Sequence, residues 1–299
     1  MNFDLSDILT RSGQITWRHK SIWGLLMLPM VVSFLALMLF GIFFLVIMNI
    51  TDGDIPDFIF VGFGLFFLLT LVISTIVNYA VRAASSSAAT LGIIRADRGE
   101  GSTKFIDLVR DGLPYFWRIL GVMLVISLTI GLAFTIFFIL AFVLIIVTIG
   151  MASICLQPIM LLLTPLMFLM VGVMDAAQIA VIVEGMNVMD AVKHAFQVVR
   201  AHVWKYVIIT LIVYLGGSIL TSFIIVPLML PIFLVPFLIA MGQEMSMQSV
   251  ALISVLLFFC IFFPVMMLVS SVIGVFMKTS LDLTYLRLTT PAEKIENQV

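Results

Sequence analysis

The sequence predicts an all-α integral membrane protein with six transmembrane helices. These helices are expected to form three pseudo-repeated hairpins, each preceded by a cytoplasmic interfacial amphipathic helix. Three observations predict this fold class: the amino-acid composition, a series of long uncharged stretches, and a motif that recurs three times along the chain.

The composition excludes several classes of protein. Of the 299 residues, 63% are hydrophobic and only 10% are charged, and the mean hydropathy is +1.28. A soluble domain is about half apolar and roughly a quarter charged. The chain therefore has too few charges for a soluble enzyme, a disordered tail or a nucleic-acid binder. The net charge of −1 gives no information about partners, and two cysteines are too few for a disulfide framework.

Long uncharged stretches define the predicted spans, because a helix needs about 20 apolar residues to cross the hydrocarbon core. The chain is expected to form a single membrane domain, 1–299. The predicted helices cover about 22–50, 57–94, 118–148, 152–185, 204–240 and 246–282. The predicted pseudo-repeats cover 1–97, 98–184 and 185–282, and a short cytoplasmic tail covers 283–299.

The distribution of charge predicts the orientation of the spans. With six spans, all 15 lysines and arginines fall on the side that holds both termini. The opposite loops carry only Asp52, Asp54, Asp57 and Glu244. Because basic loops are retained in the cytoplasm, both termini are expected to be cytoplasmic.

A motif made of an apolar–polar segment and a tryptophan–basic pair precedes each odd-numbered span. The segments cover 5–16, 104–116 and 188–203. Each is expected to lie in the cytoplasmic interface and to end at an aromatic and basic anchor. The alternative is that these segments are ordinary starts of membrane-spanning helices, each anchored at the interface by a tryptophan and a basic residue, and are not copies of one repeated unit. The predicted anchors are Trp17, Arg18, Trp23, Trp117, Arg118, Trp204 and Lys205.

The segment from Ala180 through Glu184 and Gly185 to Trp204 has a further resemblance. With Asp190, Phe196 and Arg200 it resembles a pattern in bacterial six-span membrane proteins related to the membrane domain of glycerophosphoryl diester phosphodiesterases. The resemblance implies a six-span fold in the bacterial cytoplasmic (inner) membrane. The catalytic barrel of those enzymes has no counterpart here, so no catalytic residue is carried over.

Polar residues near the cytoplasmic ends of the spans form a possible polar site: Asp175, Gln178, Asn78, Arg82 and Glu184. Asp175 and Gln178 could form a patch that faces the bundle, or Asp175 could be an interfacial carboxylate paired with a nearby arginine or with water. Arg82 could reach lipid phosphates or contact a substrate. Glu184 could bond the next interfacial helix. We predict no catalytic residues, cofactor or metal site, because no span has a charge near its middle.

Small residues recur every four positions in the second span, at Ala80, Ala84, Ala88 and Gly92. Small residues at this spacing allow helix backbones to approach closely in a membrane. The stripe therefore predicts tight helix packing within the chain, or contact with another subunit.

Two functions fit these observations. The first is a non-catalytic accessory subunit or scaffold of a membrane complex, whose partners are membrane lipids and other membrane protein subunits rather than nucleic acid. The alternative is a permease or translocator for lipid-like or other apolar small molecules. A polar-lined cavity within the bundle would favour the permease, whereas a filled centre would favour the subunit.

Overall fold

The computed structural model describes residues 4–50, 57–99, 104–148, 150–242 and 258–289, and these residues are almost entirely helical. The helices that contain the apolar stretches are long because nothing in those stretches competes for backbone hydrogen bonds. In chain order the elements are α1 (Leu5–Arg18), α2 (Lys20–Ile50), α3 (Asp57–Arg98), α4 (Phe105–Gly112), the 3₁₀ turn η1 (Leu113–Tyr115), α5 (Phe116–Val147), α6 (Ala152–Val183), α7 (Val188–Ala201), α8 (Val203–Gly242), the π-helical turn η2 (Phe258–Phe262) and α10 (Phe263–Thr289).

Six helices in the described part of the chain are long and apolar enough to cross a membrane, as the sequence predicts for a multi-pass membrane protein. Five of them begin and end within a few residues of the predicted limits. The sixth differs at its C-terminal end, because α10 continues beyond residue 282 to Thr289. The predicted start of this span near 246 lies outside the described residues, as do Asp52, Asp54 and Glu244.

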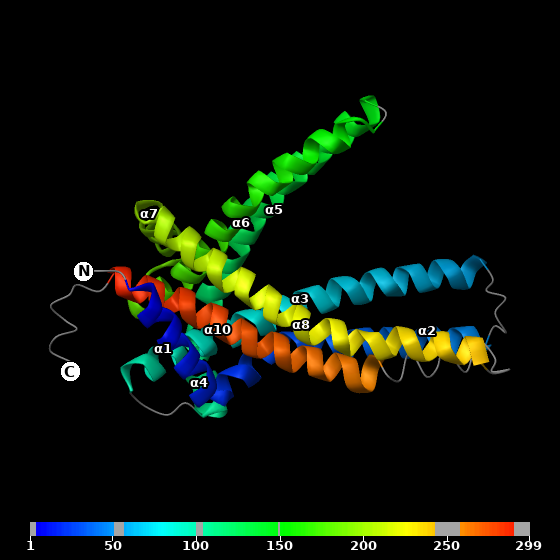
Figure 1. Cartoon of the computed structure of the whole chain (residues 1–299), viewed down its shortest axis with the longest axis horizontal. Helices are drawn as coiled ribbons and strands as arrows, with labels where there is room; N and C mark the ends of the chain where they lie inside the picture. Colours follow the sequence, from blue (N-terminus) through cyan, green and yellow to red (C-terminus); the bar gives the residue numbers. More distant parts are fainter. Residues whose placement is uncertain (1–3, 51–56, 100–103, 149, 243–257, 290–299) are drawn as a thin grey trace.

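The helices diverge from one end of the molecule, which we call the basal end (Figure 1). The start of α1 and the end of α10 lie there, together with the short helices α4 and α7. Four long helices, α2, α3, α8 and α10, leave the basal end as one group, and the α5–α6 hairpin leans away from them. The basal half is therefore where all six spans meet.

The basal helices form where the sequence predicts amphipathic segments. In α1 the Asp4 side chain accepts a hydrogen bond from the backbone N–H of Ser6 at 2.9 Å, which caps the helix, and one face, which includes Ile8 and Ile15, is buried. The second segment is shorter than its predicted range of 104–116. Helix α4 ends at Gly112 and becomes a 3₁₀ turn, because Pro114 has no backbone N–H to continue an α-helix.

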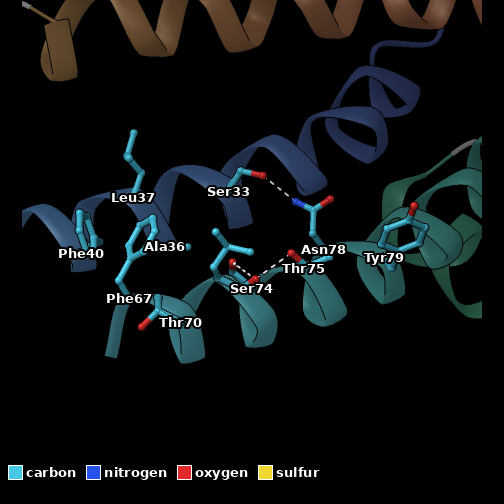
Figure 2. A pocket seen from close by; sticks show the side chains of 11 residues that line it. Ser33, Ala36, Leu37, Phe40, Phe67, Thr70, Ser74, Thr75, Asn78 and Tyr79 are labelled. Atoms are coloured by element: carbon cyan, nitrogen blue, oxygen red, sulfur yellow. Dashed lines mark hydrogen bonds between the residues drawn. The ribbon is translucent and has the colours of Figure 1, made fainter. Parts of the chain in front are cut away.

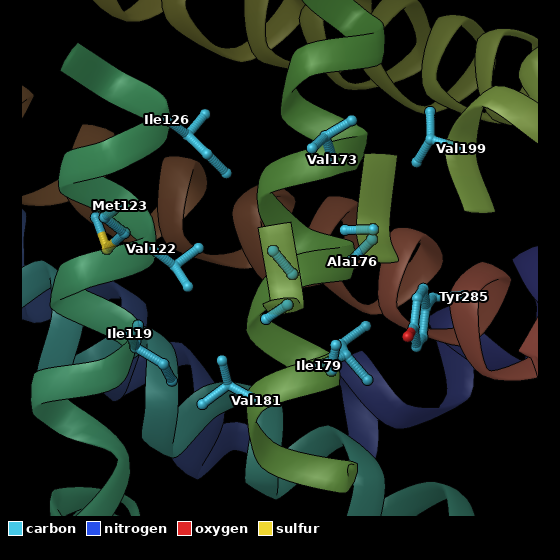
Figure 3. Close-up of a cluster of buried hydrophobic side chains, with 14 of the residues drawn as sticks. Ile119, Val122, Met123, Ile126, Val173, Ala176, Ile179, Val181, Val199 and Tyr285 are labelled. Carbon is cyan, nitrogen blue, oxygen red and sulfur yellow. The ribbon is translucent and has the colours of Figure 1, made fainter. Parts of the chain in front are cut away.

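Two clusters of buried apolar side chains hold the basal half together. In the first, α5 packs against α6 through residues such as Ile119, Val122 and Ile179, with Val199 of α7 and Tyr285 of α10 at its edge (Figure 3). The second joins α1, α2, α3, α4, α8 and α10. Where these side chains lie within the spans, they stabilise the fold through close van der Waals packing, because lipid is as apolar as the protein interior.

The small-residue stripe of α3 packs mainly against the basal helix α4. A Cβ atom added to Gly112 would lie 2.9 Å from the backbone nitrogen of Ala88, and one added to Gly92 would lie 3.0 Å from Leu108. Ala88 is fully buried, whereas Ala80 and Ala84 are only partly buried. The stripe therefore provides close packing within the chain at its basal half.

Candidate functional site

Three helices have segments that are buried on all sides, and these segments form the centre of the basal half. They are the second helices of the three hairpins, and they cover 85–90 in α3, 175–181 in α6 and 278–285 in α10. A helix buried on all sides needs a neighbour on every face. The segments are rich in Ala, Ser and Thr, which allows the close approach of the three backbones.

A chain of polar contacts connects these three helices. Ser86 of α3 donates a hydrogen bond to Gln178 Oε1 of α6 at 2.5 Å. Lys278 of α10 donates to the same Gln178 oxygen at 3.0 Å and to Asp175 Oδ1 of α6 at 3.2 Å. Lys278 and Asp175 are each only 8% exposed. A buried ammonium of this kind is tolerated only when it is paired and hydrogen-bonded.

A second carboxylate, Asp282, lies one helical turn after Lys278 and is fully buried. Its Oδ1 atom is 3.8 Å from Lys278 Nζ. Neither of its oxygens accepts a hydrogen bond from the residues that the structure describes. Hydroxyl groups that are also buried without such a partner belong to Thr90, Tyr206, Thr210 and Thr279. The centre thus holds two acidic side chains and one lysine.

A cavity of about 380 Å³, which we call the chamber, opens beside this cluster, and its wall combines polar side chains with apolar ones such as Met123 and Met174. Asp175, Gln178 and Lys278 lie in its wall, as do Asn78 and Arg82 of α3. Hydroxyl groups contribute much of the remaining lining, and they belong to Ser33, Ser85, Ser86, Tyr214, Ser270 and Ser271. The Arg82 guanidinium has no hydrogen bond or ion pair within the described part of the chain.

A second cavity of about 380 Å³, which we call the slot, lies between α2 and α3 (Figure 2). It is mainly apolar, with Leu37, Phe40 and Phe67 in its wall. Ser33 and Asn78 line both cavities. Asn78 Nδ2 donates to Ser33 Oγ at 2.6 Å and to the Pro29 carbonyl oxygen at 2.9 Å. This polar pair marks the junction between the chamber and the slot.

Four of the five residues predicted as a possible polar site share the wall of the chamber: Asp175, Gln178, Asn78 and Arg82. The expected arginine partner of Asp175 is not found among the described residues, where its ion-pair partner is Lys278. Glu184 lies apart from the chamber lining. It accepts a hydrogen bond from Tyr285 at 2.8 Å and lies 3.7 Å from His194 of the following helix α7.

The sequence reasoning missed Lys278 and Asp282. It ended the last span at 282 and so placed both residues at the cytoplasmic end, whereas α10 continues for two further turns and buries them. A signal was present, because Lys278 and Asp282 have the i,i+4 spacing of an ion pair on one helix face.

The predicted anchors occupy exposed positions at the basal end. Trp17, Trp117 and Trp204 are 67%, 76% and 78% exposed, respectively. Trp23 is partly buried, and its Nε1 atom donates to the Thr16 carbonyl oxygen at 2.8 Å. Arg118 donates to the Gly185 carbonyl oxygen at 3.0 Å. Large exposed indole rings beside basic residues are typical of membrane interfaces, and the interfacial role of these residues stays a prediction.

Comparison with protein-family models, curated proteins and solved structures finds no match for this chain. The resemblance to phosphodiesterase membrane domains therefore stays a prediction. Among the described residues, no group of three or more His, Cys, Asp and Glu side chains could hold a metal ion.

Proposed function

We propose that this protein binds a lipid-like amphipathic anion and acts as a permease or translocator for it, without catalysing a reaction. One observation supports this proposal above the others: a chamber that contains an arginine without a hydrogen bond or ion pair among the described residues shares Ser33 and Asn78 with an apolar slot. A molecule with a charged head and an apolar chain matches both cavities at once.

The chamber supports the anionic part of the proposal. Lys278 is already paired with Asp175, so Arg82 is the cation that remains available to a ligand among the described residues that line the chamber. A guanidinium binds carboxylate and phosphate groups through two parallel hydrogen bonds. The neighbouring hydroxyls of Ser85 and Ser86 add polar groups that suit such a head.

The slot supports the apolar part. It follows α3 from Asn78 to Phe67, a distance of about 16 Å at 1.5 Å per residue. Its volume of about 380 Å³ lies within the range of known small-molecule sites. Its aromatic and aliphatic walls would hold a hydrocarbon chain without leaving polar groups unpaired.

A binding measurement with a charge-neutral substitution tests this proposal. The purified full-length protein in lipid nanodiscs is titrated with fluorescent alkyl phosphate, alkyl carboxylate and uncharged alkyl glycoside probes of equal chain length. Arg82→Gln should weaken binding of the anionic probes about tenfold or more, because one charge-assisted contact contributes about 1.5–3 kcal/mol. Comparison of the two anions identifies the preferred head group.

Arg98→Gln is the matched control, because Arg98 lies in the same helix but is exposed and outside the chamber. This variant should bind like the wild type, and the uncharged probe should not distinguish the variants. Equal binding of the anionic probes to Arg82→Gln and wild type would refute the proposal. Placing a bulky side chain in the slot by Ala36→Phe should weaken binding of all three probes.

The proposal also covers the orientation of the protein in its membrane and the internal repeat of its fold. We infer that both termini are cytoplasmic, that the membrane is the bacterial cytoplasmic membrane, and that each hairpin with its preceding basal helix is one of three pseudo-repeats. The alternating distribution of basic residues supports the orientation. The equivalent places of α3, α6 and α10 at the centre support the repeat.

An accessory subunit or scaffold is the second candidate function, and one observation favours it. The α5–α6 hairpin leans away from the other spans, and its far half exposes apolar side chains such as Leu140 and Val147 (Figure 1). These exposed apolar side chains are the surface that a transmembrane helix of a partner subunit would contact. A photo-crosslinking residue at Leu140 should then form a specific protein adduct in native membranes, whereas lipid-only adducts would count against a partner.

A further inference from the structure

Asp282 is a fully buried carboxylate to which the proposed function assigns no role. It does not line the chamber, whereas Asp175 and Lys278 do. The Lys278 ammonium is 3.2 Å from Asp175 and 3.8 Å from Asp282. It therefore lies between one carboxylate that faces the chamber and another that is enclosed by protein.

The charge balance of this cluster implies a bound proton. One lysine neutralises one carboxylate, so Asp175, Lys278 and Asp282 together are neutral only when one carboxyl group is protonated. An uncompensated charge in an enclosed site is costly. The observed geometry fits protonation of Asp282, because Lys278 donates hydrogen bonds to Asp175 and Gln178 and none to Asp282.

Among the described residues, no cation other than Lys278 acts directly on Asp282. Besides Lys278 and Asp175, the polar groups that interact with the Asp282 carboxyl group are the Tyr206 hydroxyl of α8 and the Thr90 hydroxyl of α3. Helices α1 and α2 also pack on α10, where their buried side chains form an apolar cluster with α10 residues 281 and 283. Arg82 of α3 acts on Lys278 from the chamber side.

We propose that Asp282 is a proton-binding site and that Lys278 transmits its protonation state to the chamber. When the Asp282 carboxyl group releases its proton, the carboxylate attracts the Lys278 ammonium. Asp175 then loses its partner and presents a negative charge to the chamber, beside Arg82. That charge opposes an anionic head group, so the anion binds best when Asp282 is protonated.

Proton binding and anion binding are therefore coupled. By linkage, an anion in the chamber increases the affinity of Asp282 for its proton by the same factor by which the proton increases anion affinity. A single charge within one cavity changes affinity by roughly tenfold at an effective protein dielectric constant. The chamber would thus take up one proton and one amphipathic anion together.

This inference rests on the proposed function, and its test uses a probe whose own charge is constant. A fluorescent alkyl sulfonate stays ionised between pH 5 and 8, so any pH dependence belongs to the protein. In nanodiscs, wild-type affinity should increase about tenfold from pH 8 to pH 5. Asp282→Asn, which mimics the protonated carboxyl group, should bind with the acid-form affinity at every pH.

Two further variants complete the design. Asp190→Asn, which removes an exposed carboxylate of α7, should follow the wild type. Asp175→Asn should bind without pH dependence, because Lys278 and Asp282 then neutralise each other without a proton. The latter variant keeps the test decisive if Asp282→Asn does not fold. A pH dependence that persists in either cluster variant overturns the inference and leaves the proposed function intact.

Infrared spectroscopy separates failure of the inference from failure of the proposed function. A protonated carboxyl group has a carbonyl absorption distinct from that of a carboxylate. This band should be present in the ligand-free wild type, titrate with pH, and be absent from Asp282→Asn. If no sulfonate binds at any pH, the proposed function fails, and the band alone then supports or overturns the proton site.

Discussion

Lys278 shows at the residue scale how a single buried charge organises the centre of this protein. Its ammonium hydrogen-bonds two groups of α6 and lies in the same helix as the buried Asp282. By contrast, Asp111 of the basal helix α4 pairs with Arg95 of α3 at 2.6 Å, and these side chains are 42% and 26% exposed, respectively. Buried and exposed pairs of this kind differ severalfold in their effect on stability.

Replacing the buried lysine should therefore destabilise the fold strongly. Lys278→Met keeps most of the side-chain volume but leaves Asp175 and Asp282 without their cation, and we expect a loss of about 3–5 kcal/mol in the free energy of unfolding. Asp111→Asn, at the exposed pair, should cost less than about 1 kcal/mol. Denaturant unfolding in mixed micelles measures both. Adding Asp175→Asn and Asp282→Asn to Lys278→Met should restore much of the stability, and absence of this rescue would contradict the charge argument.

A second residue-scale prediction concerns His19, which joins α1 to α2 outside the spans. Partial burial, together with the nearby Arg18 and Arg11, lowers the pKa of His19 below its usual value of 6.5. The unfolded chain then binds a proton at higher pH than the folded protein. This contribution to stability is present above pH 6.5 and is lost as the pH falls from 6.5 toward the lowered pKa.

His19→Gln removes this titration. The drop in melting temperature between pH 7.5 and pH 5.5 should be smaller in this variant than in the wild type. His202→Gln is the control, because this histidine lies at another helix junction, where its Nδ1 atom donates one local hydrogen bond to the Val198 carbonyl oxygen in the tautomer that carries the proton on Nδ1. An equal drop in wild type and His19→Gln would show that His19 does not contribute.

Close backbone packing is the dominant feature at the scale of elements. Helix α4 packs directly on α3 because Gly112 has no side chain to separate its backbone from the backbone of Ala88. This contact explains why α4 stays packed on α3, although α4 is short and ends at Gly112, just before Pro114. It also means that the stripe in α3 holds the basal helix α4 in place as well as contributing to the packing between spans.

Gly112→Ala should therefore disturb this contact, although alanine favours helix formation. The added Cβ would lie 2.9 Å from the Ala88 backbone nitrogen, so α4 must shift, and overpacking of this kind costs about 1–3 kcal/mol. Gly13→Ala in α1 is the matched control, because its Cβ meets no atom within 4 Å. The control should be neutral or more stable by up to about 1 kcal/mol in denaturant unfolding. A neutral Gly112→Ala would contradict the observed packing.

At the scale of the whole molecule, the six candidate spans of the described residues diverge from a shared basal end. Because the number of candidate spans is even and α1 contacts α10, the two ends of the described chain lie on the same side (Figure 1). Helices α3, α6 and α10 join at this side through side chains far apart in sequence, such as Ser86, Gln178 and Lys278.

The proposed topology can be measured directly. Reporter fusions at 54 and 244 should read as external, and fusions at 101 and 299 should read as cytoplasmic, because all basic residues then lie inside. Cysteine substitutions at the same positions, labelled with an impermeant reagent in intact cells, provide an independent check. A cytoplasmic reading at 54 would exclude the six-span arrangement.

The sequence by itself determined the coarse fold class, an all-helical chain with six candidate spans among the described residues, and the limits of most of these spans. Hydrophobic length and charge distribution are local properties, so they can be read without knowing which helices touch. They also indicated four residues that share the chamber: Asn78, Arg82, Asp175 and Gln178.

Only the tertiary structure decided which of the polar residues meet and what kind of site they make. Lys278 appeared to be a basic residue at a helix end, because a sequence shows that a charge follows an apolar stretch but not that neighbouring helices enclose it. The continuation of α10 to Thr289 and its contact with α6 turned that residue into the buried partner of Asp175. The chamber and its junction with the slot likewise depend on helices α2, α3, α6, α8 and α10 at once, and no local pattern records such an arrangement.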